Sequence, residues 1–208
     1  HVAMNAVASS YVAVAAVYES AVAVEAVKAN ETAWSALTGA SSAVMGKAAA
    51  KLVGLNPADY ADMDAIAASS TAMAAVASSQ TAMAAVIANA TALNAVVSSS
   101  TAMAAIAASS TALSAIAAST TALDAIYAKK KRMSGASASL SGKFIILQIS
   151  NDNAFDTSRY GYATLSDGSK PKWDSYKDKY AYFKQYKKIA TYMKNDTDSD
   201  DWIDYFQC

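Results

Sequence analysis

The sequence predicts a fibrous, mainly α-helical repeat region followed by a small α+β domain at the C-terminal end. Three observations indicate this fold class. A ten-residue pattern runs through most of residues 1–133. Alanine, the best helix former, dominates that stretch. After residue 142 the composition changes, because residues 143–208 hold 20 of the 34 charged residues and all four phenylalanines.

Two columns of large apolar residues define the repeat. From residue 71 each unit reads close to Thr-Ala-Met-Ala-Ala-Val, followed by small residues. The columns are three residues apart, the spacing of neighbours on one helix face, so we expect them to form the core of the repeat region. Their members are Met73, Val76, Met83, Val86, Leu93, Val96, Met103, Ile106, Leu113, Ile116, Leu123 and Ile126.

A period of ten does not fit a straight helix. Ten residues stop about 80° short of three full turns, so the apolar stripe of a straight helix would wander to every side. Either the helix is overwound into a tight left-handed supercoil, or it is interrupted once per repeat. Ser and Thr are good N-caps and poor residues inside a helix, so the Ser-Ser-Thr segments favour interruption and short helices.

The apolar columns need a partner. Each repeat offers only two large apolar side chains among alanines, against an ordering entropy of about 1–2 kcal/mol per residue. We therefore expect identical chains to associate in parallel as a homotrimer, with the columns filling a shared axis. The alternative is a single-chain solenoid in which neighbouring repeats stack on one another.

Two boundaries divide the chain. The repeat is degraded before Pro57 and its phase slips by one residue there, so we place a break near residues 54–60 of the repeat region. Small residues follow the basic cluster Lys129–Arg132, and we assign residues 134–142 to a linker. The predicted domains are the repeat region at 1–133 and a globular domain at 143–208. The basic cluster itself is interpreted as a solvated segment.

Three strands are predicted in the C-terminal domain. Lys143–Ser150 is apolar and β-branched, which is typical of a buried strand. Tyr160–Leu165 predicts a second strand, and the following Ser-Asp-Gly predicts a turn. Trp202–Phe206 predicts the last strand.

One helix is predicted between the second and the last strand. In residues 174–195, Tyr182, Tyr186, Ile189 and Met193 are spaced by 4, 3 and 4, which predicts an amphipathic helix over the sheet. The alternation of Tyr180 and Tyr182 leaves a strand possible in the same segment.

Aromatic residues are the candidate recognition residues. The C-terminal domain has more of them than a core of about 65 residues hides. Exposed Tyr and Trp among polar neighbours are typical of surfaces that bind proteins or sugars. The candidates are Trp173, Tyr176, Tyr180, Tyr182, Trp202 and Tyr205.

Several other classes of function are excluded by what the sequence contains. His1 is its only histidine, and no nucleophile elbow, phosphate loop or dinucleotide fingerprint occurs, so we expect no enzyme and no cofactor. The 17 basic and 17 acidic residues give no case for nucleic acid. The uncharged stretch between Ala65 and Leu123 is interrupted by polar residues, which excludes membrane insertion.

An acidic turn at Asp196–Asp201 resembles a calcium loop in its alternating carboxylates. Asp201 stands where that loop needs glycine, and Gln207 where it needs a bidentate glutamate. We therefore interpret the turn as solvated and expect no metal. Cys208 is the only cysteine, so it has no partner for an intrachain disulfide.

The run STAMAAVASSQTAMAAVIANATALNAVVSSSTAMAAIAASSTALSAIAAS, with the opening VAMNAVASS, resembles the alanine-rich ten-residue repeats of bacteriophage tail fibres. The strand GKFIILQIS before an aromatic-rich end resembles the tip of such a fibre. The resemblance implies a homotrimeric virion fibre with other tail proteins as partners, whose distal end binds a glycan or protein on a host cell. Two alternatives stay open: a bacterial surface adhesin or extracellular filament subunit, and an ice-binding protein with a threonine every ten residues.

Overall fold

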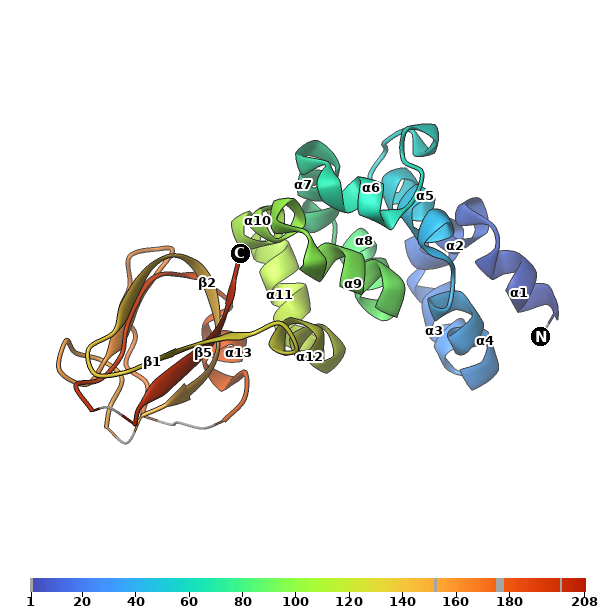
Figure 1. The fold of residues 1–208 in the computed structure, drawn as a ribbon. Helices are drawn as coiled ribbons and strands as arrows, with labels where there is room; N and C mark the ends of the chain where they lie inside the picture. Colours follow the sequence, from blue (N-terminus) through green and yellow to red (C-terminus); the bar gives the residue numbers. More distant parts are fainter. Residues whose placement is uncertain (1, 152, 175–177, 199) are drawn as a thin grey trace. The chain divides into compact units, whose positions relative to one another are not determined.

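The computed structural model describes residues 2–151, 153–174, 178–198 and 200–208. The chain divides into two compact units, His1–Ala122 and Leu123–Cys208 (Figure 1). The first is helical and the second contains the sheet, so the mixed helix and sheet content matches the predicted repeat region and α+β domain. The boundary lies earlier than predicted, within the helix α12 (Thr120–Tyr127).

Short helices build the first unit, one for each ten-residue repeat. Within the regular repeats each helix has eight or nine residues, with one residue between consecutive helices. Interruption, and not overwinding, is therefore how the chain accommodates the period of ten. The helices are α1 (Val2–Ala8), α2 (Tyr11–Glu19), α3 (Ala21–Lys28), α4 (Glu31–Thr38), α5 (Ser42–Leu52), α6 (Met63–Ala68), α7 (Ser70–Ser78), α8 (Gln80–Ala88), α9 (Ala90–Ser98), α10 (Ser100–Ala108) and α11 (Ser110–Ala118).

A single capping residue turns the chain between helices. Ser79 is extended, at φ −100° and ψ 116°, and its N–H donates to the carbonyl of Val76 at the end of α7. Its hydroxyl accepts from the N–H of Ala82 at the start of α8. One residue thus ends one helix and caps the next, and such caps stabilise by about 0.5–2 kcal/mol each. The bend between α7 and α8 is 102°.

Helices three apart in the chain stack on each other. α10 packs on α7, α9 on α6 and α11 on α8 (Figure 1). Hydrogen bonds from the residues between helices also join successive layers. The hydroxyl of Ser99 donates to the carbonyl of Ala67, and that of Ser109 donates to the carbonyl of Ala77. About thirty residues therefore complete one layer of a single-chain superhelix.

The predicted columns form the core of this superhelix. The ten members in the first unit, from Met73 to Ile116, are between 0 and 5% exposed within one chain, and Leu123 and Ile126 of the second unit are fully buried as well. The columns were expected to need a shared axis between chains because one chain could not cover them, and that reason was wrong. A neighbouring layer of the same chain covers the ten members in the first unit, as in the solenoid alternative. Alanines one residue before the first column, among them Ala82 and Ala102, are fully buried and let the layers approach closely.

The predicted break interrupts the stacking. A 3-10 helix, η1 (Pro57–Asp59), follows α5, and Asp62 caps α6 through the N–H of Ala65. Gly46 faces the backbone of this insertion, where a Cβ would lie 2.2 Å from the carbonyl carbon of Asp62, so only glycine fits. After the insertion α8 packs on α5, and α5 packs on α2.

The second unit contains a five-stranded antiparallel sheet. Its strands are β1 (Lys131–Ser134), β2 (Ser139–Ser150), β3 (Tyr162–Leu165), β4 (Ala190–Lys194) and β5 (Trp202–Gln207), in the order β1-β5-β2-β4-β3. The three predicted strands are confirmed as β2, β3 and β5. The predicted linker at 134–142 contains the end of β1 and the start of β2. Phe144, Ile146, Phe155, Tyr182 and Met193 belong to the buried core.

The predicted helix over residues 174–195 is wrong in its second half. α13 spans only Ala181–Tyr186. Lys187 takes a left-handed conformation at φ 52°, which ends the helix, and its N–H bonds back to the carbonyl of Phe183. Ile189 lies directly before the strand β4 and Met193 lies on it, and both are buried by strand packing and not on a helical face.

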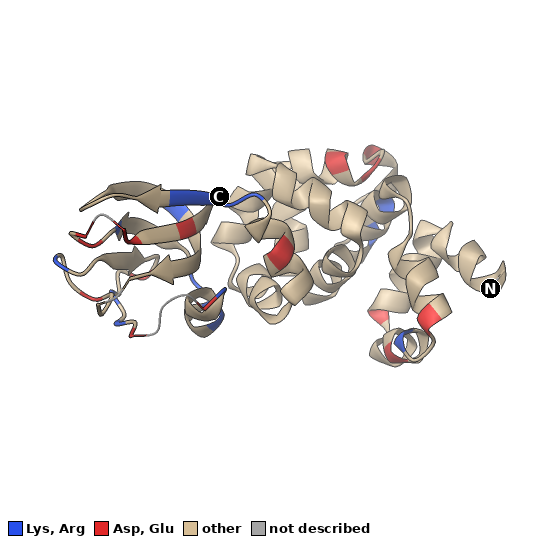
Figure 2. Cartoon of the chain, turned by 60° about the horizontal axis from the view of Figure 1, so that its bottom comes forward, with Lys and Arg blue, Asp and Glu red and all other residues tan. Residues whose placement is uncertain are grey.

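The two units differ in their content of charged residues. Figure 2 shows helices of the first unit without charged residues, in accord with the uncharged stretch between Ala65 and Leu123. Within the described residues no single helix is long and apolar enough to cross a bilayer. Three pairs of consecutive helices reach that length and composition only together, and each pair is bent by 92–102°.

Candidate functional sites

Trp202 lies on a charged cluster at one edge of the sheet. Arg132 of β1 faces Asp204 of β5 across the ladder, and its Nε and Nη2 donate to the two carboxylate oxygens at 2.6 and 2.9 Å. The guanidinium carbon lies 3.6 Å from the centre of the Trp202 ring. The bond to Asp204 raises the pKa of Arg132. Trp202 is half-buried, so part of its ring is available at the surface.

Trp173 belongs to an aromatic cluster beside α13. Its ring packs edge-on against Tyr182 at 5.6 Å and Tyr186 at 6.4 Å, and Tyr182 also contacts Phe155. Tyr182 is 3% exposed, and burial raises the pKa of its hydroxyl. Trp173 and Tyr186 are half-buried and form the accessible part of this cluster.

Tyr180 and Tyr205 lie in the interior. Tyr180 is 5% exposed and donates from its hydroxyl to Asp124 at 2.6 Å, and burial together with this bond raises its pKa. Tyr205 is 7% exposed and packs edge-on against Phe144. These two and Tyr182 stabilise the domain and offer little surface to a partner. Tyr176, the remaining sequence candidate, lies outside the described residues.

A tyrosine pair on β3 and β4 was missed by the sequence reading. Tyr162 and Tyr192 lie 5.5 Å apart, and the ammonium of Lys170 lies 4.4 Å from the centre of the Tyr162 ring. Both tyrosines are half-buried, and β3 is an edge strand. The pairing of Thr164 with Tyr192 creates this neighbourhood. Residue spacing along one strand does not reveal this pair, because only the register between β3 and β4 makes the two tyrosines neighbours.

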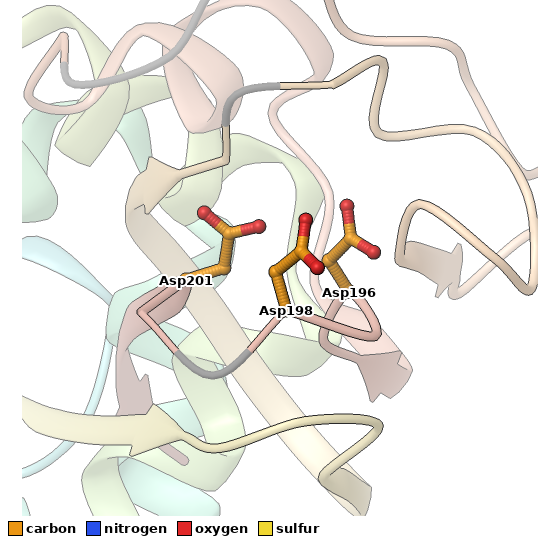
Figure 3. A group of neighbouring side chains, drawn as sticks. All are labelled: Asp196, Asp198 and Asp201. Atoms are coloured by element: carbon orange, nitrogen blue, oxygen red, sulfur yellow. The ribbon is translucent and has the colours of Figure 1, made fainter.

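The acidic turn between β4 and β5 gathers three carboxylates. Ligand oxygens of Asp196, Asp198 and Asp201 all lie within 4.8 Å of one another, and Figure 3 shows the three side chains extending from the same turn. Asp196 and Asp201 are buried and only Asp198 is exposed, so the expectation of a fully solvated turn was wrong for two of them. Asp196 accepts from the N–H and hydroxyl of Thr197. Carboxylate oxygens are the ligand type that calcium takes.

The helical unit has a groove of about 820 Å³. Residues of α2, α3 and α4 line one side, and residues of α8, α11 and the start of α12 line the other. The break in the repeat explains it. α3 packs on its chain neighbours α2 and α4, but none of its residues is buried, in contrast to the helices of the regular layers. Its apolar column residues Val24 and Val27 stay partly exposed.

Comparisons of the chain with models of known protein families and with curated proteins found no match.

Proposed function

We propose that the chain is a structural component of a bacteriophage tail fibre, that its second unit attaches to a receptor on the host cell, and that it is not an enzyme. The observation that carries this proposal is the two-part organisation. A repeating superhelix, whose layers use the same contacts again and again, precedes a compact sheet domain with half-buried aromatic rings beside cations. The bacterial adhesin remains the rival with the same organisation.

The superhelix suits the role of a spacer. Each helix from α5 to α8 packs on its neighbour and on the helix three further along, so added repeats lengthen the array without new interfaces. The hydrogen bonds from Ser99 to Ala67 and from Ser109 to Ala77 show the same joint in successive layers. A spacer of this kind holds a recognition domain away from a particle.

The homotrimer stays part of the proposal, on a different ground. Because one chain covers its own apolar columns, association has to use other surfaces, such as those carrying the exposed Val2, Val12 and Val22. Three recognition domains on one fibre would turn weak contacts into durable attachment. Light scattering combined with small-angle X-ray scattering measures the mass, and a value near three times 21.5 kDa is expected. A monomer would remove the trimer from the proposal.

The ice-binding alternative has less support. It requires threonines on one flat face, but the helices that carry Thr71 and Thr81 are bent by 102° relative to each other. Successive threonines therefore point in different directions.

Adsorption to bacterial cells tests the attachment role. The fluorescent full chain is offered to a panel of bacterial strains, and cell-bound fluorescence is measured. Trp202→Leu and Tyr192→Ser alter half-buried aromatic residues, and Gln185→Ala alters an exposed residue of α13 as the matched control. We expect at least one aromatic variant to lose about tenfold in binding, as central aromatic contacts do, while the control binds normally. Binding to no strain, or equal binding by all variants, would count against attachment through this domain.

A further inference from the structure

We propose that the groove between α3 and α8 binds a short oligosaccharide of neutral or amino sugars. This site lies in the helical unit and does not depend on the proposed function of the sheet domain. Its volume of about 820 Å³ falls within the range of small-molecule sites. Four features of its lining favour this ligand over others.

The first feature is an aromatic surface. Trp34 occupies the column position that Met or Leu fills in the regular repeats, ten residues after Val24. In the regular layers this position is at most 5% exposed, whereas Trp34 is half-buried and lines the groove. An indole has an apolar face with a polar N–H at its edge, which suits the C–H face and hydroxyl rim of a pyranose ring.

The second feature is a buried hydroxyl without a partner. Tyr18 lines the groove and is 7% exposed, and its hydroxyl has no hydrogen-bond partner among the described residues. Buried polar groups are normally paired, so this hydroxyl is free to bond a ligand atom once a small shift of the groove lining exposes it. Burial raises the pKa of Tyr18 to about 12, so the hydroxyl keeps its proton at neutral pH. It therefore offers a donor to a sugar oxygen.

The third feature is the polar rim. Glu19, Glu25, Lys28, Gln80 and Thr81 line the groove, and they supply both donors and acceptors at its edge. Sugar hydroxyls donate and accept, so they match such a rim. A ten-residue helix of a second copy would bring an apolar column against these charges and leave them buried without compensation.

The fourth feature is the charge. Lys28 pairs with Glu25 at 3.0 Å, which leaves Glu19 as the uncompensated charge of these three. The net negative charge disfavours acidic sugars and favours amino sugars. Small alanines such as Ala84 and Ala115 on the opposite side leave space for the ring.

The experiment uses the ¹⁵N-labelled full chain and four trisaccharides. They are the trimers of glucosamine, N-acetylglucosamine, glucose and galacturonic acid. The three tryptophan indole N–H signals report separately on the two units, since Trp34 lies in the helical unit and Trp173 and Trp202 in the sheet domain. Trp34→Phe assigns its signal. Isothermal titration gives the affinity, for which a dissociation constant below about 1 mM is expected.

We expect at least one of the first three trimers to shift the Trp34 signal while the galacturonic acid trimer does not. Tyr18→Phe should weaken binding at least about fivefold, because it removes only the unpartnered hydroxyl. Tyr182→Phe is the matched control. It removes a similarly buried hydroxyl, which has no hydrogen-bond partner among the described residues, from the other unit, and it should not alter binding at Trp34.

Four results would overturn the proposal. The first is no shift of the Trp34 signal with any trimer at about 10 mM, a concentration that would reveal even millimolar affinity. The second is equal binding of the acidic trimer. The third is a Trp34 signal that moves with protein concentration alone, which would assign the groove to a second copy. Shifts confined to Trp173 and Trp202 would also overturn it, while supporting recognition by the sheet domain.

Discussion

The side-chain amide of Asn89 donates to the backbone carbonyl of Ala40, 49 residues earlier, at 2.8 Å. The same nitrogen donates to the carbonyl of Thr38 at 2.7 Å, and the side-chain oxygen caps α9 through the N–H of Ala92. Asn89 is 1% exposed. In the layers after the break, Ser99 and Ser109 make the corresponding joint with one hydroxyl bond. Asn89 therefore connects the layers on both sides of the break, where the longer amide reaches two carbonyls.

Asn89→Ser should destabilise the helical unit by about 1–3 kcal/mol, because serine keeps the cap but leaves the buried carbonyl of Ala40 and the partly buried carbonyl of Thr38 without this donor. Urea unfolding followed by circular dichroism at 222 nm measures the change. Ser79→Ala is the control that removes a cap alone, at a cost of about 0.5–2 kcal/mol. If Asn89→Ser left stability unchanged, the amide would have no role in joining the layers.

Ala102→Leu should destabilise by about 1–3 kcal/mol or more, because Ala102 is fully buried between layers and extra methyl groups overpack the contact. Ala104→Leu, two residues along the same helix, changes an exposed position and should stay within about 0.5 kcal/mol of the parent. Equilibrium unfolding of both variants makes the comparison. Equal effects at the two positions would contradict the stacking of α10 in one chain.

The sequence was sufficient to predict which residues form the core of the repeat region, but not which elements cover them. A spacing of three within a period of ten marks the same residues in a solenoid and in a trimer, so Met73 and Val76 are buried in either architecture. The deciding feature is the conformation of one residue per repeat. Ser79 is extended and turns the chain by 102°, which brings α10 back onto α7. The pattern of apolar residues does not determine the angle of this bend.

The C-terminal domain shows the opposite difficulty. Its longest strand could be predicted because the segment Lys143–Ser150 is β-branched and apolar. The helix was extended too far because Tyr182, Tyr186, Ile189 and Met193 happen to keep helical spacing across Lys187, whose left-handed conformation separates α13 from β4. Aromatic residues were chosen by type, and burial then divided them, with Tyr180 and Tyr205 inside and Trp202 near the surface.

Arg132→Met should destabilise the sheet domain by about 3–5 kcal/mol, because Asp204 is 0% exposed and would lose its two guanidinium bonds. Arg132→Lys should cost less, since it keeps the charge but loses the bidentate geometry. Unfolding followed by tryptophan fluorescence measures the changes. Lys172→Ala breaks an exposed ion pair with Asp174 and should cost about 0–1 kcal/mol. If Arg132→Met lost as little stability as Lys172→Ala, Asp204 would not depend on Arg132.

The thiol of Cys208 should react slowly while the domain is folded. Burial raises its pKa from 9.0 to about 12, so the thiolate is far scarcer at pH 8 than in an unfolded chain. Since the thiolate is the nucleophile, we expect labelling by iodoacetamide at pH 8 to be at least about a hundredfold slower in the native chain than in urea. Mass spectrometry of timed samples measures both rates.

The same shift fixes a direction for stability against pH. Between pH 9 and about 12 the unfolded chain has released the thiol proton and the folded chain has not, so stability falls as the pH rises through this window. Below pH 9 both states keep the proton and the effect is absent. Cys208→Ser should remove this part of the alkaline decline and leave the rest, which comes from buried tyrosines such as Tyr180. Rapid labelling of the native chain, or an unchanged alkaline decline in the serine variant, would show that the thiol is accessible and free to cross-link neighbouring chains.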